Sequence, residues 1–279
     1  MLRTEQLSLA YGDKPVVDNI SLTIPEGGIT CLLGPNGSGK STLLKSFAGL
    51  LPARSGQVYL DDQAVGKWDR RRLALRLAML PQKPIVPDGI KVRDLVALGR
   101  FPHRKWWQRN LTADDNATVE AMAMTGVSDL GERPVESLSG GQQQRAWIAM
   151  ALAQETDILL LDEPTTFLDW GYQLEVLELL SMLNRQHGLT VVMSLHDLNQ
   201  AAQFADRVAV LADGQLDTIG SPREVITETL INRVFRVKTT VTLGPDDRPF
   251  CSGFSESARE GLPAREDDPI HAIAQSQTS

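Results

Sequence analysis

The sequence predicts an α/β fold with a mostly parallel central sheet, an N-terminal antiparallel β subdomain and an inserted α-helical subdomain. Short, continuous apolar runs have the length and composition of strands buried on both faces of a sheet, at Ile29–Leu33, Ile158–Leu161 and 191–195. Helical stretches separate these runs, and strands that alternate with helices form parallel sheets. From about residue 85 to residue 155 the pattern is largely helical, so this block is expected to interrupt the sheet as a subdomain.

The first part of the chain shows the alternation of half-buried strands. Apolar residues alternate with polar ones at Leu7 and Leu9 and again from Ile20 to Ile24, and glycine-containing turn signals separate the two segments. The elements expected after them, in chain order, are the strand at 29–33, a glycine-rich turn, a helix over 42–51 and strands at 58–60 and 77–80.

The second part of the chain continues the alternation. Thr112 and Asp115 have the spacing of a capping box, which predicts a helix that opens there and runs through Met124. The elements expected next are a helix over 146–153, strands at 158–161 and 191–195 on either side of a helix over 172–183, a strand pair around residue 214 and a helix over 222–234. Residues 1–237 are expected to form one domain. Residues 238–279 are expected to form an extension with a mobile polar tail from about residue 255.

Composition and charge exclude several classes of protein. The hydrophobic fraction is 42% and the charged fraction is 23%, as in an ordinary globular chain. No apolar run approaches the roughly 18 residues that a membrane-spanning helix needs, and the N-terminus lacks the layout of a signal peptide. The formal net charge is −7, which disfavours nucleic acid as a partner, since phosphate binding calls for a basic surplus. With only two cysteines and no disulfide framework, the chain is expected to be cytoplasmic.

A glycine-rich segment between a strand and a helix has the pattern of a phosphate-binding loop (P-loop). Two glycines bracket four residues, and Lys and Ser follow, in the order Gly34, Pro35, Asn36, Gly37, Ser38, Gly39, Lys40 and Ser41. The glycines allow successive N–H groups to point inward, and the following helix adds the positive end of its dipole. Lys40 is expected to reach the β- and γ-phosphates, and the Ser41 hydroxyl to bind Mg²⁺. A glycine turn without a ligand does not explain the full match, so the chain is expected to bind a nucleoside triphosphate.

Two carboxylates follow the apolar run Ile158–Leu161, at the strand edge where ligands of α/β sheets bind. Asp162 is expected to bind Mg²⁺, either directly or through water. Glu163 is expected to act on the attacking water as general base or as the group that orients it. An acidic turn is common after a strand, and it is the pairing with the P-loop that favours this chemistry.

A third segment combines a helix start with two glycines. Ser139 can cap the helix, Gln142 completes a Ser-x-x-Gln box, and Gly140 and Gly141 allow a close backbone approach. By itself the segment could be an ordinary capped helix start. Such an N-terminus can also receive an anion.

The ensemble of motifs over residues 1–237 resembles the ATP-binding cassette (ABC) ATPases. The resemblance implies that Tyr11 stacks on adenine, that Gln82 contacts Mg²⁺ and the attacking water, and that His196 contacts the γ-phosphate. Asp169 matches the loop that crosses to the opposing subunit. The resemblance further implies a head-to-tail homodimer, in which the Ser139–Gln142 segment binds the γ-phosphate of ATP bound by the partner. The nucleotide-binding residues it implies within one chain are Tyr11, Gly34, Pro35, Asn36, Gly37, Ser38, Gly39, Lys40, Ser41 and Thr42, with Ser139, Gly140, Gly141 and Gln142 serving the partner's ATP.

Local sequence also bears on the cargo. The segment 99–103, with 165–169 and 196–201, is similar to stretches in importer cassettes for ferric siderophores, and cassettes for cobalamin or haem remain alternatives. The resemblance implies two integral-membrane permease subunits, an indirect link to a periplasmic or surface substrate-binding protein, and a location on the cytoplasmic face of the inner membrane. A non-transport ABC ATPase that acts on nucleic acid is a more distant alternative, and no nucleic acid is expected as a partner.

The basic and aromatic run at 104–109 has three possible interpretations. It could stack single-stranded nucleic acid, or it could lie beside anionic lipid headgroups next to a permease. It could equally be a solvated helix end with one packed tryptophan.

Overall fold

The central strand β3 (Ile29–Leu33) is buried at every position and has parallel neighbours on both sides. This computed structural model describes residues 1–84, 88–104, 115–244 and 246–256. The six-stranded sheet that contains β3 has the order β10-β9-β3-β8-β7-β6, and all its pairings are parallel except β9 with β10. Its other strands are β6 (Leu77–Leu80), β7 (Ile158–Leu161), β8 (Thr190–Ser194), β9 (Arg207–Ala212) and β10 (Gln215–Gly220). The predicted α/β fold with a mostly parallel sheet is confirmed.

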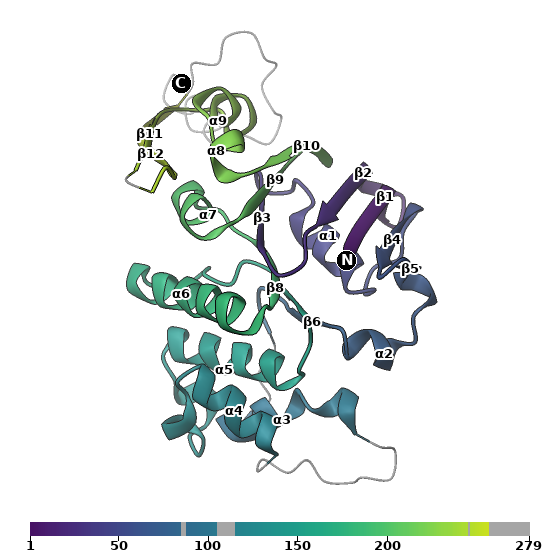
Figure 1. Cartoon of the computed structure of the whole chain (residues 1–279), viewed down its shortest axis with the longest axis vertical. Coiled ribbons are helices and arrows are strands. Elements are labelled where there is room, and N and C mark those ends of the chain that lie inside the picture. The colour runs from purple at the N-terminus through teal and green to yellow at the C-terminus, as the bar shows by residue number, and fades with distance from the viewer. Residues whose placement is uncertain (85–87, 105–114, 245, 257–279) are drawn as a thin grey trace, which may run out of the picture.

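A second sheet lies beside the first and is antiparallel, as predicted (Figure 1). Its order is β2-β1-β4-β5, with β1 (Leu2–Tyr11), β2 (Lys14–Ile24), β4 (Ser55–Leu60) and β5 (Gln63–Ala64). The alternating apolar side chains of β1 and β2 pack with helix α1 (Lys40–Phe47) and with one face of the parallel sheet in a common core, in which Phe47 is fully buried.

Helices fill the segment between β6 and β7. They are α3 (Val92–Leu98), α4 (Asn116–Met124) and α5 (Gly140–Ala153), with single 3₁₀ turns at Phe101–His103, Ser128–Leu130 and Val135–Ser137. These helices gather at one end of the molecule, below α6 (Trp170–His187) in the view of Figure 1. Helix α4 begins later than predicted, because Asp115 caps it by accepting a hydrogen bond from Ala117 N at 3.1 Å. The expected start at Thr112 lies outside the described residues.

The C-terminal part differs from the prediction in one detail. The single helix expected over 222–234 is two helices, α8 (Pro222–Val225) and α9 (Glu228–Phe235), since Thr227 starts a new helix by capping Leu230 N at 3.2 Å. Strands β11 (Val237–Leu243) and β12 (Pro249–Glu256) then form a hairpin, which ends close to residue 255, where the tail is expected to begin. Residues 257–279 lie outside the described residues. The remaining helices are α2 (Arg70–Ala74), α7 (Leu198–Phe204) and the 3₁₀ turn Val65–Lys67.

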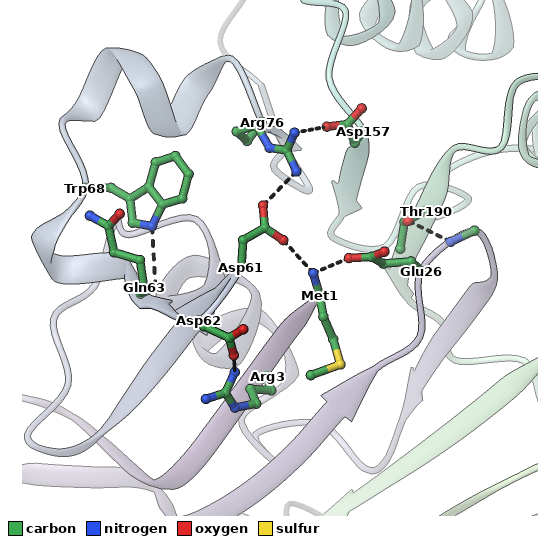
Figure 2. Close-up of polar contacts among 11 residues, drawn as sticks. Met1, Arg3, Glu26, Asp61, Asp62, Gln63, Trp68, Arg76, Asp157 and Thr190 are labelled. Atoms are coloured by element: carbon green, nitrogen blue, oxygen red, sulfur yellow. Dashed lines mark hydrogen bonds and ion pairs between the residues drawn. The ribbon is translucent and has the colours of Figure 1, made fainter.

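A polar network joins the antiparallel sheet to the parallel one (Figure 2). Arg76, directly before β6, pairs with Asp61 at 2.7 Å and with Asp157 at 2.8 Å, so one guanidinium bridges the β4–β5 turn and the start of β7. The Met1 ammonium also pairs with Asp61, at 2.6 Å, and contacts Glu26. These contacts fix the two sheets relative to each other, and thereby the P-loop that lies between them.

Among the described residues, no helix combines the length and the apolar composition that crossing a membrane requires.

Candidate active site

The loop between β3 and α1 can be built only with glycine at two places. Gly34 has a φ of 147°, and a Cβ there would lie 2.0 Å from the carbonyl oxygen of Leu211. Gly39 has a φ of 102°, and a Cβ there would lie 2.7 Å from Val17 Cγ2. The loop is therefore pressed against β9 on one side and β2 on the other, which brings its backbone N–H groups to the N-terminus of α1.

Lys40 begins α1 and is almost completely buried, with 5% of its surface exposed. Its Nζ donates to the carbonyl oxygens of Gly34 at 2.8 Å and Pro35 at 3.1 Å. Burial lowers the pKa of Lys40, and the negative charges of Glu163 and Asp162 oppose that effect. A buried ammonium at a helix N-terminus, beside carboxylates, is suited to an anionic ligand.

The rest of the loop fits phosphate groups as well. The Ser38 hydroxyl is buried and has no hydrogen-bond partner among the described residues, so it is available to a ligand oxygen. Asn36 and Gly37 form the exposed tip of the loop. Thr42 is buried in the first turn of α1. The donors of the loop thus fit a polyphosphate chain.

Asp162 follows β7 and meets the P-loop helix. The Ser41 hydroxyl donates to Asp162 Oδ1 at 2.9 Å, although 121 residues separate them in the chain. The described residues contain no group of three or more His, Cys, Asp or Glu side chains that could bind a metal. Mg²⁺ does not need such a cage, because it binds through one or two protein oxygens, water and the phosphates of its nucleotide. The oxygens of Ser41 and Asp162 fit that pattern.

Glu163 lies at the centre of a group of polar side chains. His196 Nε2 lies 2.6 Å from Glu163 Oε1, Thr166 Oγ1 donates to Oε2 at 2.9 Å, and the exposed amide of Gln82 also contacts Oε2. Partial burial tends to raise the pKa of Glu163, but the hydrogen bonds from His196 and Thr166 outweigh it and keep the pKa below its usual range. Glu163 is therefore ionised at neutral pH. The predicted residues Glu163, His196 and Gln82 are brought together.

The Ser139–Gln142 segment begins α5 with the predicted capping box. Gln142 N donates to Ser139 Oγ at 3.3 Å, and Ser139 N donates to Gln142 Oε1 at 3.1 Å. Gly141 is required because a Cβ there would lie 2.6 Å from Cδ1 of Tyr172 on α6. Ser139 and Gly140 are exposed. The segment lies in the helical part of the chain, apart from α1 and the P-loop of the same chain (Figure 1).

Two further predicted residues lie at the edges of the site. Tyr11 ends β1 with 48% of its surface exposed, and its ring centroid lies 6.0 Å from Nζ of Lys45 on α1. An exposed aromatic ring beside the P-loop helix can receive a flat base. Asp169 is exposed at the N-terminus of α6, and its side chain does not cap that helix.

Sequence reasoning missed Ser194 and Thr166. Ser194 ends β8, is fully buried, and donates to Asp162 Oδ1 at 2.8 Å. The available signal was a polar residue inside the apolar run 191–195, at the end of a central strand. For Thr166 the signal was a hydroxyl three residues after Glu163, within the same turn.

Curated proteins of similar sequence include ATP-binding proteins of iron-chelate import. Petrobactin import ATP-binding protein FpuD of Bacillus anthracis is 46% identical over 251 residues, which cover 90% of this chain and 92% of FpuD. Iron(3+)-hydroxamate import ATP-binding protein FhuC of Bacillus subtilis (strain 168) is 44% identical over 251 residues, or 90% of this chain and 93% of FhuC.

Solved structures of similar fold include an inward-facing metal-chelate type ABC transporter. The TM-score between the two is 0.78 and the sequence identity is 27%. The superposition covers 94% of this chain and 99% of that one. The dimeric structure of the bacterial ABC transporter cassette MJ0796 has a TM-score of 0.70 at 29% identity, covering 80% of this chain and 99% of that one. The family model described as "ABC transporter" matches residues 17–166. The chain therefore belongs to the ABC transporter family, as an ATP-binding ATPase of that family.

Proposed function

We propose that the chain hydrolyses ATP to energise the import of a ferric siderophore through two separate integral-membrane permease subunits. The observation that carries the proposal is the meeting of three segments at one sheet edge: the P-loop with Lys40, the Ser41–Asp162 pair at 2.9 Å, and the Glu163–His196 pair at 2.6 Å. The cargo rests on the relatives whose names state petrobactin or iron(3+)-hydroxamate import.

The phosphates of ATP would occupy the P-loop, where Lys40 is the cation within reach. Its ammonium would exchange its two bonds to the loop carbonyls for bonds to phosphate oxygens, which carry full charge and bind more strongly. The Ser38 hydroxyl would find its partner there. The Tyr11 ring, beside α1, would stack on the adenine.

Ser41, Asp162 and Gln82 are the side chains suited to Mg²⁺. When bound, Mg²⁺ would supply positive charge that stabilises the phosphate oxygens during transfer. The Ser41 hydroxyl and the Asp162 carboxylate already point toward each other, so little rearrangement of the chain is needed.

Glu163 is suited to accept the proton of the attacking water or to orient that water. It is ionised, and it is oriented by Thr166 from its own turn and by His196 from the end of β8. His196, beside Glu163, would contact the γ-phosphate, and Gln82 would join the water site to the surface loop that contains it.

We place the second half of each ATP site on a partner copy. Ser139 and Gly140 are exposed at the start of α5, and Gly141 and Gln142 follow them in its first turn, as a surface for the γ-phosphate of the partner's ATP requires. Asp169, also exposed, would cross to the partner in such a head-to-tail homodimer. The dimer would bind the permeases at the cytoplasmic face of the membrane, with a substrate-binding protein outside.

The test is uptake of labelled ferric siderophore by cells that lack this protein and carry either the wild type or Glu163→Gln. We expect uptake to be restored only by the wild type, and a parallel assay on the purified chain to show ATP hydrolysis. If iron uptake is unchanged in the deleted cells while the purified chain hydrolyses ATP, the ferric-siderophore cargo is wrong. If the purified, folded chain neither binds nor hydrolyses ATP, the enzymatic proposal itself is wrong.

A further inference from the structure

Ser194 is a fully buried hydroxyl at the edge of the sheet where the site lies. It is the last residue of β8, which runs between β3 and β7. In the parallel pairing of these strands Leu161 lies beside Met193, so Ser194 lies beside Asp162, the first residue after β7. The pairing of the strands, rather than a flexible loop, therefore places the hydroxyl.

The hydroxyl makes two hydrogen bonds, and both go to the pair of acidic residues. Ser194 Oγ donates to Asp162 Oδ1 at 2.8 Å and accepts from Glu163 N at 2.8 Å. One oxygen atom thus connects the side chain of Asp162 to the backbone of Glu163. The hydroxyl uses its single proton in one bond and one of its two lone pairs in the other, so its orientation is determined.

The backbone of Glu163 needs this support. Its φ is 50°, in the left-handed region that non-glycine residues rarely adopt. Such a conformation persists only where surrounding contacts fix it, and it determines the direction in which the side chain leaves the chain. The bond from Glu163 N to Ser194 Oγ is a contact of that kind.

Asp162 is constrained from the same side. Its Oδ1 accepts from Ser194 at 2.8 Å and from Ser41 at 2.9 Å. Ser194 is buried within the sheet, whereas Ser41 lies on the P-loop helix. The bond from Ser194 is thus the one that ties the carboxylate rotamer to the sheet.

We propose that Ser194 is a positioning residue for ATP hydrolysis, whose hydroxyl fixes the Glu163 backbone and the Asp162 carboxylate in one arrangement. This inference rests on the proposed function. Its hydroxyl bonds to the Asp162 carboxylate and to the Glu163 backbone, so Ser194 acts on the hydrolytic step through those two residues.

Thr190 provides a matched control on the same strand. It starts β8, is buried, and its hydroxyl also accepts a backbone N–H, from Gly27 at 2.9 Å. It lies at the end of the strand away from the acidic pair. Ser194→Ala and Thr190→Val therefore remove the same kind of bond from the same strand, once beside the site and once far from it.

The experiment measures kcat, KM for ATP and the unfolding temperature of full-length wild type, Ser194→Ala, Thr190→Val and Ser194→Thr. We expect Ser194→Ala to lower kcat by about 10- to 100-fold, the loss typical of a slightly misplaced catalytic group. We expect its KM to change little, because the P-loop is intact. Ser194→Thr, which retains the hydroxyl, should recover most of the lost kcat, and Thr190→Val should have the kcat of the wild type.

A kcat for Ser194→Ala equal to that of Thr190→Val overturns the inference, since loss of a buried hydrogen bond would then have no specific consequence. The inference is also overturned if Ser194→Ala lowers the unfolding temperature enough to explain its lower kcat and Ser194→Thr does not recover that kcat. Failure of the wild type itself to hydrolyse ATP would instead refute the proposed function.

Discussion

The substitution Glu163→Gln keeps the shape of the side chain but removes its negative charge and its ability to accept a proton. The amide oxygen can still accept a hydrogen bond from Thr166 or His196, which contact the carboxylate at 2.9 and 2.6 Å. The bonds of Lys40 within the P-loop do not involve Glu163. We therefore expect a folded protein that binds ATP as the wild type does and hydrolyses it poorly.

The size of the loss follows from the basicity of the carboxylate. A general base contributes about 10²- to 10⁴-fold to a rate, and most when its pKa lies near the working pH. The pKa of Glu163 is below its usual range, far from neutrality, so its contribution belongs in the lower part of that interval. We expect kcat to fall by about 10²- to 10³-fold, which corresponds to about 3–4 kcal/mol of activation free energy.

Steady-state hydrolysis of Mg²⁺-ATP and light scattering after size exclusion measure the two consequences. Because closure of the proposed dimer precedes hydrolysis, Glu163→Gln should accumulate as an ATP-bound dimer. Glu178→Gln is the control. Glu178 is an exposed residue on α6, and this substitution removes the same charge. If Glu163→Gln retained the hydrolysis rate of Glu178→Gln, the carboxylate would not be the base. If it stayed monomeric with ATP and no permease were needed for dimerisation, the head-to-tail sandwich would be wrong.

Three other predictions concern the edges of the site and the scaffold. Lys40→Ala should abolish ATP binding and uptake while the circular dichroism spectrum stays native, and retained uptake would contradict the P-loop assignment. Tyr11→Ala should raise the KM for ATP by about 2- to 12-fold, the equivalent of the roughly 0.5–1.5 kcal/mol of an aromatic contact, and nucleotide titration measures it. Arg76→Ala should lower the free energy of unfolding by about 0.5–1 kcal/mol, because its pairs with Asp61 and Asp157 are partly exposed. Urea denaturation checks that value, and an unchanged midpoint would show that the bridge between the sheets contributes nothing.

Three strands that form continuous apolar runs could be located from the sequence to the residue, whereas the strand predicted at 191–195 is observed one residue earlier, as β8 (Thr190–Ser194). Ile29–Leu33, Leu77–Leu80 and Ile158–Leu161 are observed with the predicted bounds, since each lies inside the sheet and polar or turn-forming residues follow it. Helix ends were harder to predict, because a helix begins where a side chain can accept a hydrogen bond from a nearby backbone N–H, which the apolar periodicity does not show. Asp115 and Thr227 each accept a bond from a nearby backbone N–H and start a helix where periodicity alone indicates nothing.

The residues of the site also differ in how readily the sequence identifies them. Lys40, Asp162 and Glu163 could be found because their motifs are contiguous in sequence, and their surroundings identify the chemistry. For Ser194 the sequence offers a polar residue inside the apolar run 191–195, but its partners depend on the pairing of β7 with β8, in which Leu161 lies beside Met193. The pattern of either strand alone therefore does not show what this side chain contacts.

The internal bonds of the site bear on how ATP binding and hydrolysis are linked. Lys40 bonds to the loop carbonyls, Asp162 to Ser41 and Ser194, and Glu163 to His196 and Thr166. Ionised phosphate oxygens accept hydrogen bonds, so they can replace the loop carbonyls as partners of Lys40 and can approach His196, but they have no proton with which to replace Ser194 as the donor to Asp162. ATP binding should thus reorganise Lys40 and leave the acidic pair attached to the sheet. We therefore propose that most of the arrangement that hydrolyses ATP is formed within one chain, and that a partner adds the exposed helix start at Ser139.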